Sequence, residues 1–167
     1  MEFEKEYYTE DDHGGFFLRL AAYLIDGVLV SVVIWILAFI LIGSSFMTMA
    51  VDVENDQVSE EQMMALAGSM GLLAVISIVI TWLYFAIMES SKNQATVGKM
   101  VLGLKVTNLN GDPIGFGQAT GRYFGKIISA LIMYIGFIMI AFTEKKQGLH
   151  DMIAATLVLK KDVPPLS

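Results

Sequence analysis

The stretch from Leu20 to Ile42 constrains this chain most, because its 23 residues contain a single charged side chain, Asp26. A helix of that length can cross the hydrocarbon core of a bilayer, which is about 30 Å thick. A charged side chain inside such a span costs about 2.5–3.5 kcal/mol on insertion scales, so Asp26 needs either a partner or a function. Arg19 lies two helical turns earlier, so both side chains project from one face, about 10 Å apart, with Ala22 between them.

A second apolar stretch makes this an integral membrane protein. Gly68 to Met88 gives 21 residues without a charge, and the whole chain is 55% hydrophobic but only 17% charged. Soluble proteins average about 25% charged residues. We therefore expect membrane spans at about residues 17–42 and 68–88, closed in the first case by Gly43 and the serines after it.

The third apolar segment, residues 127–142, is short for a span and contains Gly136. Residues 104–109 and 155–160 both read as short strands, and strands can pair only on one side of the membrane. We expect segment 127–142 to dip in and return around Tyr134–Gly136; a full third crossing is the alternative. The expected fold is a mainly α membrane protein with two long transmembrane helices, a third short or re-entrant helical segment, and a small cytoplasmic β-hairpin-like cap.

The distribution of basic residues predicts the topology. Residues 89–126 carry five Lys and Arg side chains, whereas residues 43–67 carry none. Cytoplasmic loops are rich in Lys and Arg. The N-terminus and residues 89–126 are therefore expected to be cytoplasmic, and loop 43–67 outside, in a multi-pass protein of the cell membrane. Ser59–Gln62 has the form of a capping box, which predicts a helix start inside that loop.

We expect three regions along the chain. Residues 1–15 form an acidic cytoplasmic leader, disordered or lying on the surface. Residues 16–160 form one membrane domain, and residues 161–167 form a tail. Within the domain, small residues recur every fourth position from Gly117 to Ser129, which favours close helix packing. Arg122 and Lys126 lie beside that seam and are interpreted as basic groups that snorkel from an interfacial helix.

Several classes of function are excluded or disfavoured by the composition. The chain has no cysteine, only two histidines, and neither a Gly-x-Ser-x-Gly nor a His-Glu-x-x-His motif, so we expect no enzyme, no cofactor and no metal site. No basic patch of the kind that binds nucleic acid is present. The expected partners are the lipid bilayer and either further copies of the chain or another membrane protein.

The ordered motifs of the chain resemble those of the RDD family of small multi-pass bacterial membrane proteins. The matching residues are Phe16–Asp26, Gln94–Lys99, Gly103–Val106 with Gly111, Ala119 with Arg122, and Gly148–Asp151 with Ala154, Thr156 and Val158. The resemblance implies that Arg19, Asp26 and Asp151 are the arginine and two aspartates that name the family. It also implies a bacterial membrane location, and transport, including exchange of cations for protons, is a suggested role for the family.

Two hypotheses for the function follow. In the first, an intramembrane carboxylate holds either a proton or a monovalent cation, so the protein is a small exchanger that must assemble as a homo-oligomer. In the second, the charges are structural, with Asp26 paired to Arg19 or Arg122, and the protein is an accessory or regulatory subunit that binds another membrane protein. The candidate ion or ion-pair site comprises Arg19, Asp26, Asp151 and Arg122, with Glu89, Gln94, Lys99 and His150 as secondary candidates. Asp151 is also placed to cap a short helix.

Overall fold

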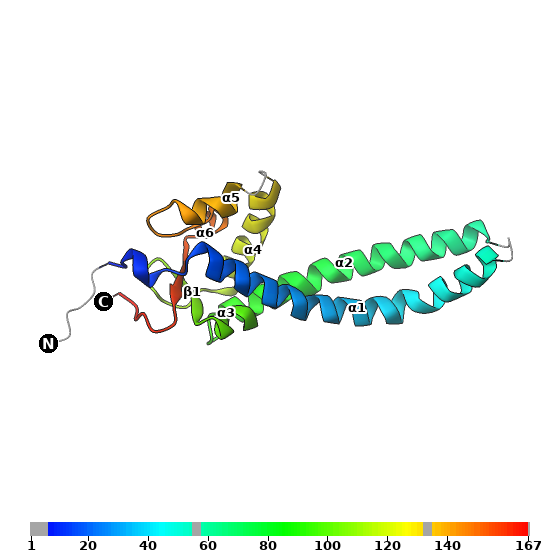
Figure 1. Cartoon of the computed structure of the whole chain (residues 1–167), viewed down its shortest axis with the longest axis horizontal. Coiled ribbons are helices and arrows are strands. Elements are labelled where there is room, and N and C mark those ends of the chain that lie inside the picture. Colours follow the sequence, from blue (N-terminus) through cyan, green and yellow to red (C-terminus); the bar gives the residue numbers. More distant parts are fainter. Residues whose placement is uncertain (1–6, 55–57, 132–134, 167) are drawn as a thin grey trace. The chain divides into compact units, whose positions relative to one another are not determined.

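The computed structural model describes residues 7–54, 58–131 and 135–166, which form two compact units (Figure 1). We call the first unit the cap; it contains the chain up to Asp26 and from Trp82 onward. We call the second unit the helical hairpin; it comprises Gly27–Thr81. Tyr134, at the expected turn of the third apolar segment, lies outside the described residues.

Helix α1, Phe16–Glu54, is longer than the sequence predicts, whereas helix α2, Glu60–Ser90, begins at the predicted capping box. Gly43 does not end the first helix, because a lone glycine costs only about 1 kcal/mol and apolar residues follow it. The expected loop 43–67 is therefore largely helical. The capping box is confirmed, since Gln62 N–H donates to Ser59 Oγ (3.2 Å) and Ser59 N–H to Gln62 Oε1 (2.9 Å).

Both long helices have the properties of membrane spans. Phe16–Gly43 and Glu60–Ser90 are long and apolar enough to cross a bilayer. No side chain that the structure describes between residues 27 and 81 is buried. A core helix of a soluble protein buries its apolar face, whereas these apolar side chains remain available to lipid or to other helices.

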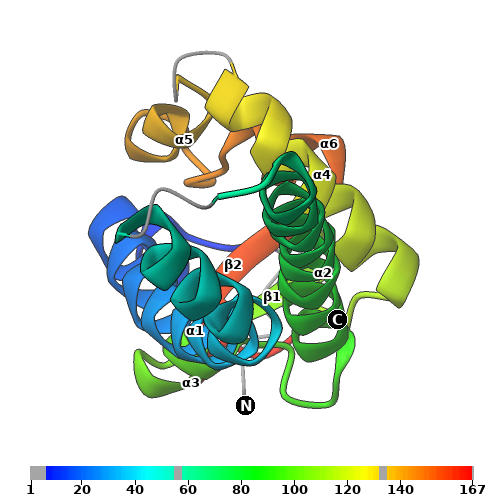
Figure 2. The ribbon, with the colours of Figure 1, turned by 90° about the vertical axis from the view of Figure 1, so that its right-hand side faces the viewer.

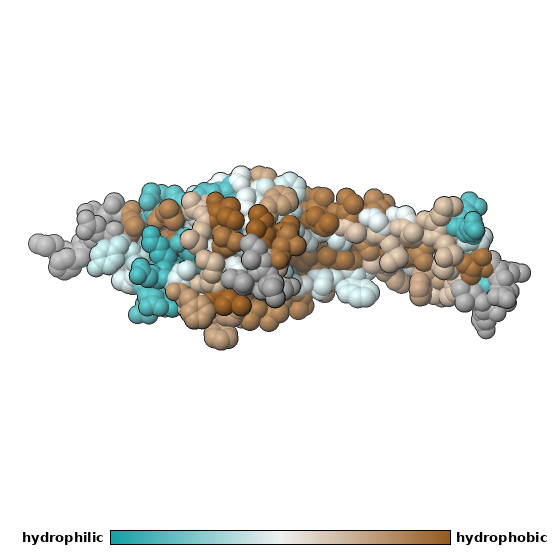
Figure 3. All heavy atoms as spheres, turned by 90° about the horizontal axis from the view of Figure 1, so that it is seen from above, coloured by the Kyte–Doolittle hydropathy of each residue, from teal (hydrophilic) through white to brown (hydrophobic). Residues whose placement is uncertain are grey.

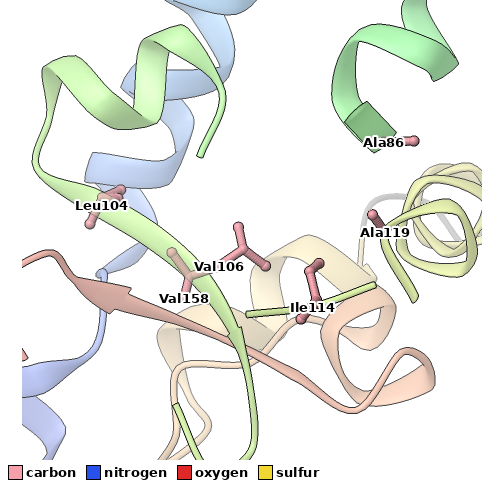
Figure 4. Close-up of a cluster of buried hydrophobic side chains, with 6 residues drawn as sticks. All are labelled: Ala86, Leu104, Val106, Ile114, Ala119 and Val158. Carbon is pink, nitrogen blue, oxygen red and sulfur yellow. The ribbon is translucent and has the colours of Figure 1, made fainter. Parts of the chain in front are cut away.

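The cap contains a two-stranded antiparallel sheet, as the sequence predicts. Strand β1 is Leu104–Asn108, strand β2 is Thr156–Lys160, and Val106 lies opposite Val158. The strands do not form a true hairpin, because helices α4 to α6 lie between them in the chain. A buried apolar cluster joins this sheet to α2 and α4 (Figure 4). Its members are Ala86, Leu104, Val106, Ile114, Ala119 and Val158.

The third apolar segment folds back on itself within the cap. Helix α4 is Phe116–Leu131, α5 is Ile135–Ile138, the 3₁₀ turn η2 is Met139–Ala141, and α6 is Leu149–Ile153. Figure 2 shows α5 and α6 beside α4. Gly136 packs so closely on Ser129 that a Cβ atom at Gly136 would lie 2.7 Å from the serine Cβ. The segment thus forms a short helical return and not one continuous helix.

The end of the N-terminal leader is tied to the cap. Residues 7–15 include the 3₁₀ turn η1, Glu10–Asp12. Gly14 N–H donates to the carbonyl of Val158 (2.8 Å), and the Tyr8 hydroxyl donates to the carbonyl of Asn110 (2.9 Å). Of the two expected forms of the leader, disorder is wrong for residues 7–15. Residues 7–11 lie at the surface, as the other form predicts, whereas residues 12–14 are buried. The acidic composition of the leader does not reveal that its backbone hydrogen-bonds to β2, the last strand.

Candidate functional site

The first turns of α1 place Arg19, Ala22 and Asp26 on one buried stripe. Their exposed fractions are 8%, 0% and 1%. The seven-residue spacing brings the three side chains to one face, as the sequence predicts. The short helix α3, Val97–Val101, crosses this stripe, and its Gly98 lies directly over the carbonyl of Ala22. A Cβ atom at Gly98 would be 2.1 Å from that carbonyl oxygen, so only glycine fits here.

Asp26 binds the start of α3. Its carboxylate accepts hydrogen bonds from the Thr96 hydroxyl (2.6 Å), the Gly98 backbone N–H (2.7 Å) and the Tyr84 hydroxyl (2.7 Å). Thr96 is the N-cap residue of α3, so the bond from Gly98 satisfies one of the backbone N–H groups that a helix start leaves without a partner. Every one of these donors is neutral.

The expected ion pairs of Asp26 with Arg19 or Arg122 are wrong. Among the described residues, both arginines pair with acids other than Asp26. Arg19 lies about 10 Å from Asp26 along the helix axis, too far for a direct bond. Its guanidinium instead donates through Nε to the carbonyl of Gly14 (2.7 Å).

Asp151 is the meeting point of the two arginines. Arg19 Nη1 lies 2.6 Å from Asp151 Oδ2, and Arg122 Nη2 lies 2.8 Å from Oδ1. Gly148 N–H also donates to Oδ2 (3.1 Å). Gly148, and not Asp151, is the N-cap residue of α6; Asp151 lies in the first turn and accepts from the backbone behind it.

Glu89, at the end of α2, binds three basic side chains. Lys99 Nζ donates to Oε1, Arg122 Nη1 lies 3.3 Å from Oε2, and Lys126 Nζ lies 3.6 Å from Oε1. The glutamate is 1% exposed. Arg122 therefore connects Glu89 to Asp151, and six side chains form one buried charge network. The network comprises Arg19, Glu89, Lys99, Arg122, Lys126 and Asp151.

The network corrects the interpretation of Arg122 and Lys126 as snorkelling groups. The Arg122 side chain is 2% exposed and that of Lys126 is 16% exposed. Lys126 Nζ also lies 4.2 Å from the ring centre of Phe85, a cation–π contact. Both side chains point into the interior of the cap, because this side of α4 packs toward α2 and α6.

The buried charges shift the pKa values of groups around them. Burial raises the pKa of Asp151, but the positive charges of Arg122 and Arg19 outweigh it and hold that pKa well below its usual range. Burial lowers the pKa of His150 to about 3, although Asp151 opposes the shift. His150 is therefore neutral at pH 7. It lies with Nε2 3.4 Å from Asp151 Oδ1 and with its ring against Phe137.

The network contains more positive than negative groups. Two arginines and two lysines meet two carboxylates, and Nη2 of Arg19 is buried without a hydrogen-bond partner in the part of the chain that the structure describes. Breaking one member of such a buried pair is costly, because it leaves an uncompensated charge out of water. The network therefore fixes α1, α2, α3, α4 and α6 to one another within the cap.

The candidate residues from the sequence do not form a single site. Arg19, Glu89, Lys99, Arg122, His150 and Asp151 come together. Asp26 is not a member of the network. It binds the backbone N–H of Gly98, the residue before the network member Lys99. Gln94 lies elsewhere: its carbonyl accepts from Val106 N–H (2.6 Å) and its side chain donates to the Val106 carbonyl (3.3 Å).

Sequence reasoning missed the residues that surround Asp26. Tyr84 gives no signal, since it is an aromatic residue in an apolar helix. Thr96 and Gly98 both lie in the stretch Gln94–Lys99 that carries the family resemblance, which is the one signal that could have identified them. Within the described residues, no three His, Asp or Glu side chains are arranged to hold a metal ion.

Comparison with known proteins places this arrangement in a family. The RDD family matches residues 13–155. The uncharacterized protein YxaI of Bacillus subtilis (strain 168) is 48% identical over 149 residues, covering 88% of this chain and 97% of YxaI. The uncharacterized membrane protein YteJ of the same strain is 32% identical over 153 residues, covering 88% of this chain and 80% of YteJ.

More distant similarity covers a smaller part of the chain. A proline-rich antigen homolog of Mycobacterium tuberculosis (strain CDC 1551 / Oshkosh) is 38% identical over 64 residues, covering 38% of this chain and 27% of that protein. No solved structure matches the chain. The match over residues 13–155 includes Arg19, Asp26 and Asp151, and also the other residues of the buried charge network. The chain belongs to the RDD family of membrane proteins.

Proposed function

We propose that this RDD protein is a non-enzymatic accessory subunit that binds another membrane protein, and that its arginine and aspartates are structural. The observation that carries the proposal is that the buried carboxylates are already bound by hydrogen-bond donors and basic side chains of the protein itself. Asp26 accepts three short hydrogen bonds and is 1% exposed, while Asp151 and Glu89 are held by four basic side chains. None of these three carboxylates is presented to solvent, as ion exchange would require.

The surface of the helical hairpin supports a binding role. Large apolar side chains along α1 are strongly exposed, among them Trp35 (75%) and Phe39 (80%). Figure 3 shows the visible face of residues 27–81 mostly in shades of brown, the hydrophobic end of the scale. Aromatic side chains are enriched among the residues that contribute most to protein contacts. We assign this surface to contact with lipid and with a partner's transmembrane helix.

The topology that fits this role keeps the cap in the cytoplasm. The basic residues within 89–126 favour a cytoplasmic position for that segment and for the N-terminus, and the acidic connection near Glu60 then lies outside. The membrane domain is assigned to residues 16–160, between the leader 1–15 and the tail 161–167. In this arrangement the cap is available to cytoplasmic partners.

Exchange of a monovalent cation for protons, by a homo-oligomer, is the second candidate. One observation favours it: all donors to Asp26 are neutral, so Asp26, unlike Glu89 and Asp151, could exchange a proton for a cation without breaking an ion pair. The hydroxyl oxygens of Tyr84 and Thr96 could turn toward such a cation as ligands.

Ion flux in proteoliposomes separates the two candidates. Purified wild type, Asp26→Asn and the exposed control Glu144→Gln are reconstituted, and proton-coupled flux of Na⁺, K⁺ and Li⁺ is recorded. The accessory role predicts no flux in any sample. Flux in wild type and in the control that disappears in folded, inserted Asp26→Asn would overturn the accessory role and establish the exchanger.

A positive test of the accessory role uses the exposed aromatic pair on α1. A membrane protein that co-purifies with wild type in a fixed ratio should no longer do so with Trp35→Ala/Phe39→Ala, because the proposed contact surface is removed. The cap should stay folded, since neither side chain belongs to it. Matched substitutions at Met63 and Met64, which are also exposed, should retain the co-purifying protein. A ratio unaffected by the aromatic pair would exclude this surface as the binding site.

A further inference from the structure

A pocket in the cap, separate from the buried charge network, gathers three lysines. Its volume is about 250 Å³. The lysines come from three segments: Lys92 follows α2, Lys105 lies on β1, and Lys161 follows β2. The remaining lining residues are Asn93, Gln94, Met100 and Leu104. Among the residues that the structure describes, no acidic side chain lines the pocket.

Hydrogen bonds to β1 and to the residue before it fix the segments that form the walls of this pocket. Gln94 has a positive φ of 52° and is fixed to β1 through both its carbonyl and its side-chain amide, which bond to Val106. Lys161 N–H donates to the carbonyl of Gly103 (2.8 Å). The segments that carry Lys92 and Lys161 are therefore anchored at either side of the start of β1.

The lysines are available to an anion. In the described part of the chain, neither the Lys92 nor the Lys161 side chain forms an ion pair or hydrogen bond, and both are exposed. Lys105 Nζ donates to the carbonyl of Val163 (2.5 Å), and its other two N–H groups are shared between the pocket and the electrostatic attraction of the nearby Asp162 carboxylate. Three ammonium groups around one hollow without a carboxylate in its lining attract an oxyanion that accepts several hydrogen bonds, such as phosphate.

The position and the lining of the pocket suit a lipid. Lys92 lies two residues beyond Ser90, the end of the candidate span α2, so we expect it to lie close to the lipid headgroups. Met100 and Leu104 add an apolar wall beside the lysines. A free phosphate ion needs no apolar wall, whereas the glycerol and first acyl carbons of a phospholipid would contact it.

We propose that this pocket binds the phosphate of an anionic phospholipid, with Lys92, Lys105 and Lys161 around the headgroup and Met100 and Leu104 against the glycerol end. The site is independent of the proposed accessory function. Basic pockets at the cytoplasmic end of spans are a known physical solution for binding anionic headgroups.

The test is lipid competition on the purified full-length protein. Native mass spectrometry in detergent compares adducts from an equimolar mixture of phosphatidylglycerol and phosphatidylcholine, for wild type, Lys92→Gln/Lys161→Gln, and the control Lys145→Gln/Lys160→Gln. Wild type and control should prefer phosphatidylglycerol. Lys92→Gln/Lys161→Gln should lose this preference roughly 30-fold, since each lysine near an anionic surface contributes about fivefold.

Three outcomes would overturn the proposal. These are equal binding of the two lipids by wild type, an equal loss in the two double variants, and displacement of the lipid by millimolar inorganic phosphate. The last result would identify a soluble phosphate as the occupant. Both pairs remove two exposed lysines, so a difference between them reports the pocket and not the net charge, and thermal unfolding confirms that both variants are folded.

Discussion

Gly98→Ala should strongly destabilise the cap, because the added methyl group would meet the backbone of α1. Gly98 brings α3 onto α1 at the carbonyl of Ala22, and a Cβ atom there would lie 2.1 Å from that oxygen and 3.0 Å from Cγ of Asp26. The obstacle is backbone, which cannot turn aside as a flexible side chain can. Helix α3 must therefore move away, and the hydrogen bond from Gly98 N–H to Asp26 lengthens beyond 2.7 Å.

The expected cost follows from two effects. Forcing extra volume into a packed site costs about 1–3 kcal/mol. Weakening a buried hydrogen bond to a charged acceptor costs about 1.5–3 kcal/mol more. The sum, about 2.5–6 kcal/mol in the free energy of unfolding, corresponds to a fall of roughly 5–25 °C in the unfolding temperature for a chain of this size.

Two glycines on α4 provide matched controls. Gly121 has nothing within 4 Å of the position that a Cβ atom would take, so Gly121→Ala should raise stability by up to about 1 kcal/mol through helix propensity alone. A Cβ atom at Gly125 would lie 3.1 Å from the Cα of His150, so Gly125→Ala should lie between the other two. The predicted order of stability is Gly121→Ala, wild type, Gly125→Ala, Gly98→Ala.

Tryptophan fluorescence during heating in detergent reports this order. Trp82 Nε1 donates to the Thr120 hydroxyl in the cap (3.2 Å), whereas Trp35 lies exposed in the helical hairpin. The chain has two tryptophans, so a Trp35→Phe background leaves Trp82 as the only reporter and makes the signal specific to the cap. A Gly98→Ala protein as stable as Gly121→Ala would refute the close approach of α3 to α1 and the assignment of Asp26 as its anchor.

The other predictions concern the buried polar groups. The pKa of His150 falls to about 3 on folding, so between about pH 3 and 6.5 the unfolded chain binds a proton that the folded chain does not. The contribution of His150 to stability is therefore complete above about pH 6.5 and falls by up to about 1.4 kcal/mol per pH unit below it. Unfolding temperatures recorded between about pH 4.5 and 7.5 should show this slope in wild type and lose it in His150→Asn. Asp151→Asn leaves two buried guanidinium groups short of a partner and should cost about 3–5 kcal/mol at pH 7, measured by the same unfolding assay, whereas a cost under 1 kcal/mol would contradict the network. Thr96→Val removes a hydroxyl donor to Asp26 with little change of shape and should cost about 1–3 kcal/mol, while the control Thr81→Val, whose hydroxyl donates to the Ser77 carbonyl within α2, should cost less than about 1 kcal/mol.

Much of the fold can be predicted from the sequence because its strongest signals are local. Runs of apolar residues predict the long helices, and residues 104–109 read as a short strand, which corresponds to β1. The ends of the helices are less predictable: α1 continues past Gly43 to Glu54 because nothing in that stretch stops a helix. Taking residues 104–109 and 155–160 as partners predicts in turn that the segment between them returns to the same side of the membrane.

The pairing of charges could not be predicted in the same way. Arg19 and Asp26 share a face of α1, and their opposite charges suggest a pair, yet each binds a residue more than 60 positions away. Side-chain partners at that separation depend on how the cap folds over α1, and the spacing of residues within one helix carries no information about it. Spacing predicts the common face correctly and the partners wrongly.

The two anchors on α1 explain why one short stripe of residues can organise the whole cap. Arg19 holds α6 through Asp151, and Asp26 holds α3 through Thr96 and Gly98. The two turns of helix between them therefore set the separation of two segments that are distant in sequence. Lys99, next to Gly98, then joins Glu89 and closes the connection back to α6 through Arg122. Both anchors are buried: losing Arg19 leaves Asp151 with Arg122 as its only positively charged partner among the described side chains, and losing Asp26 leaves the polar groups at the start of α3 without an acceptor, so either loss weakens the packing of the cap on α1.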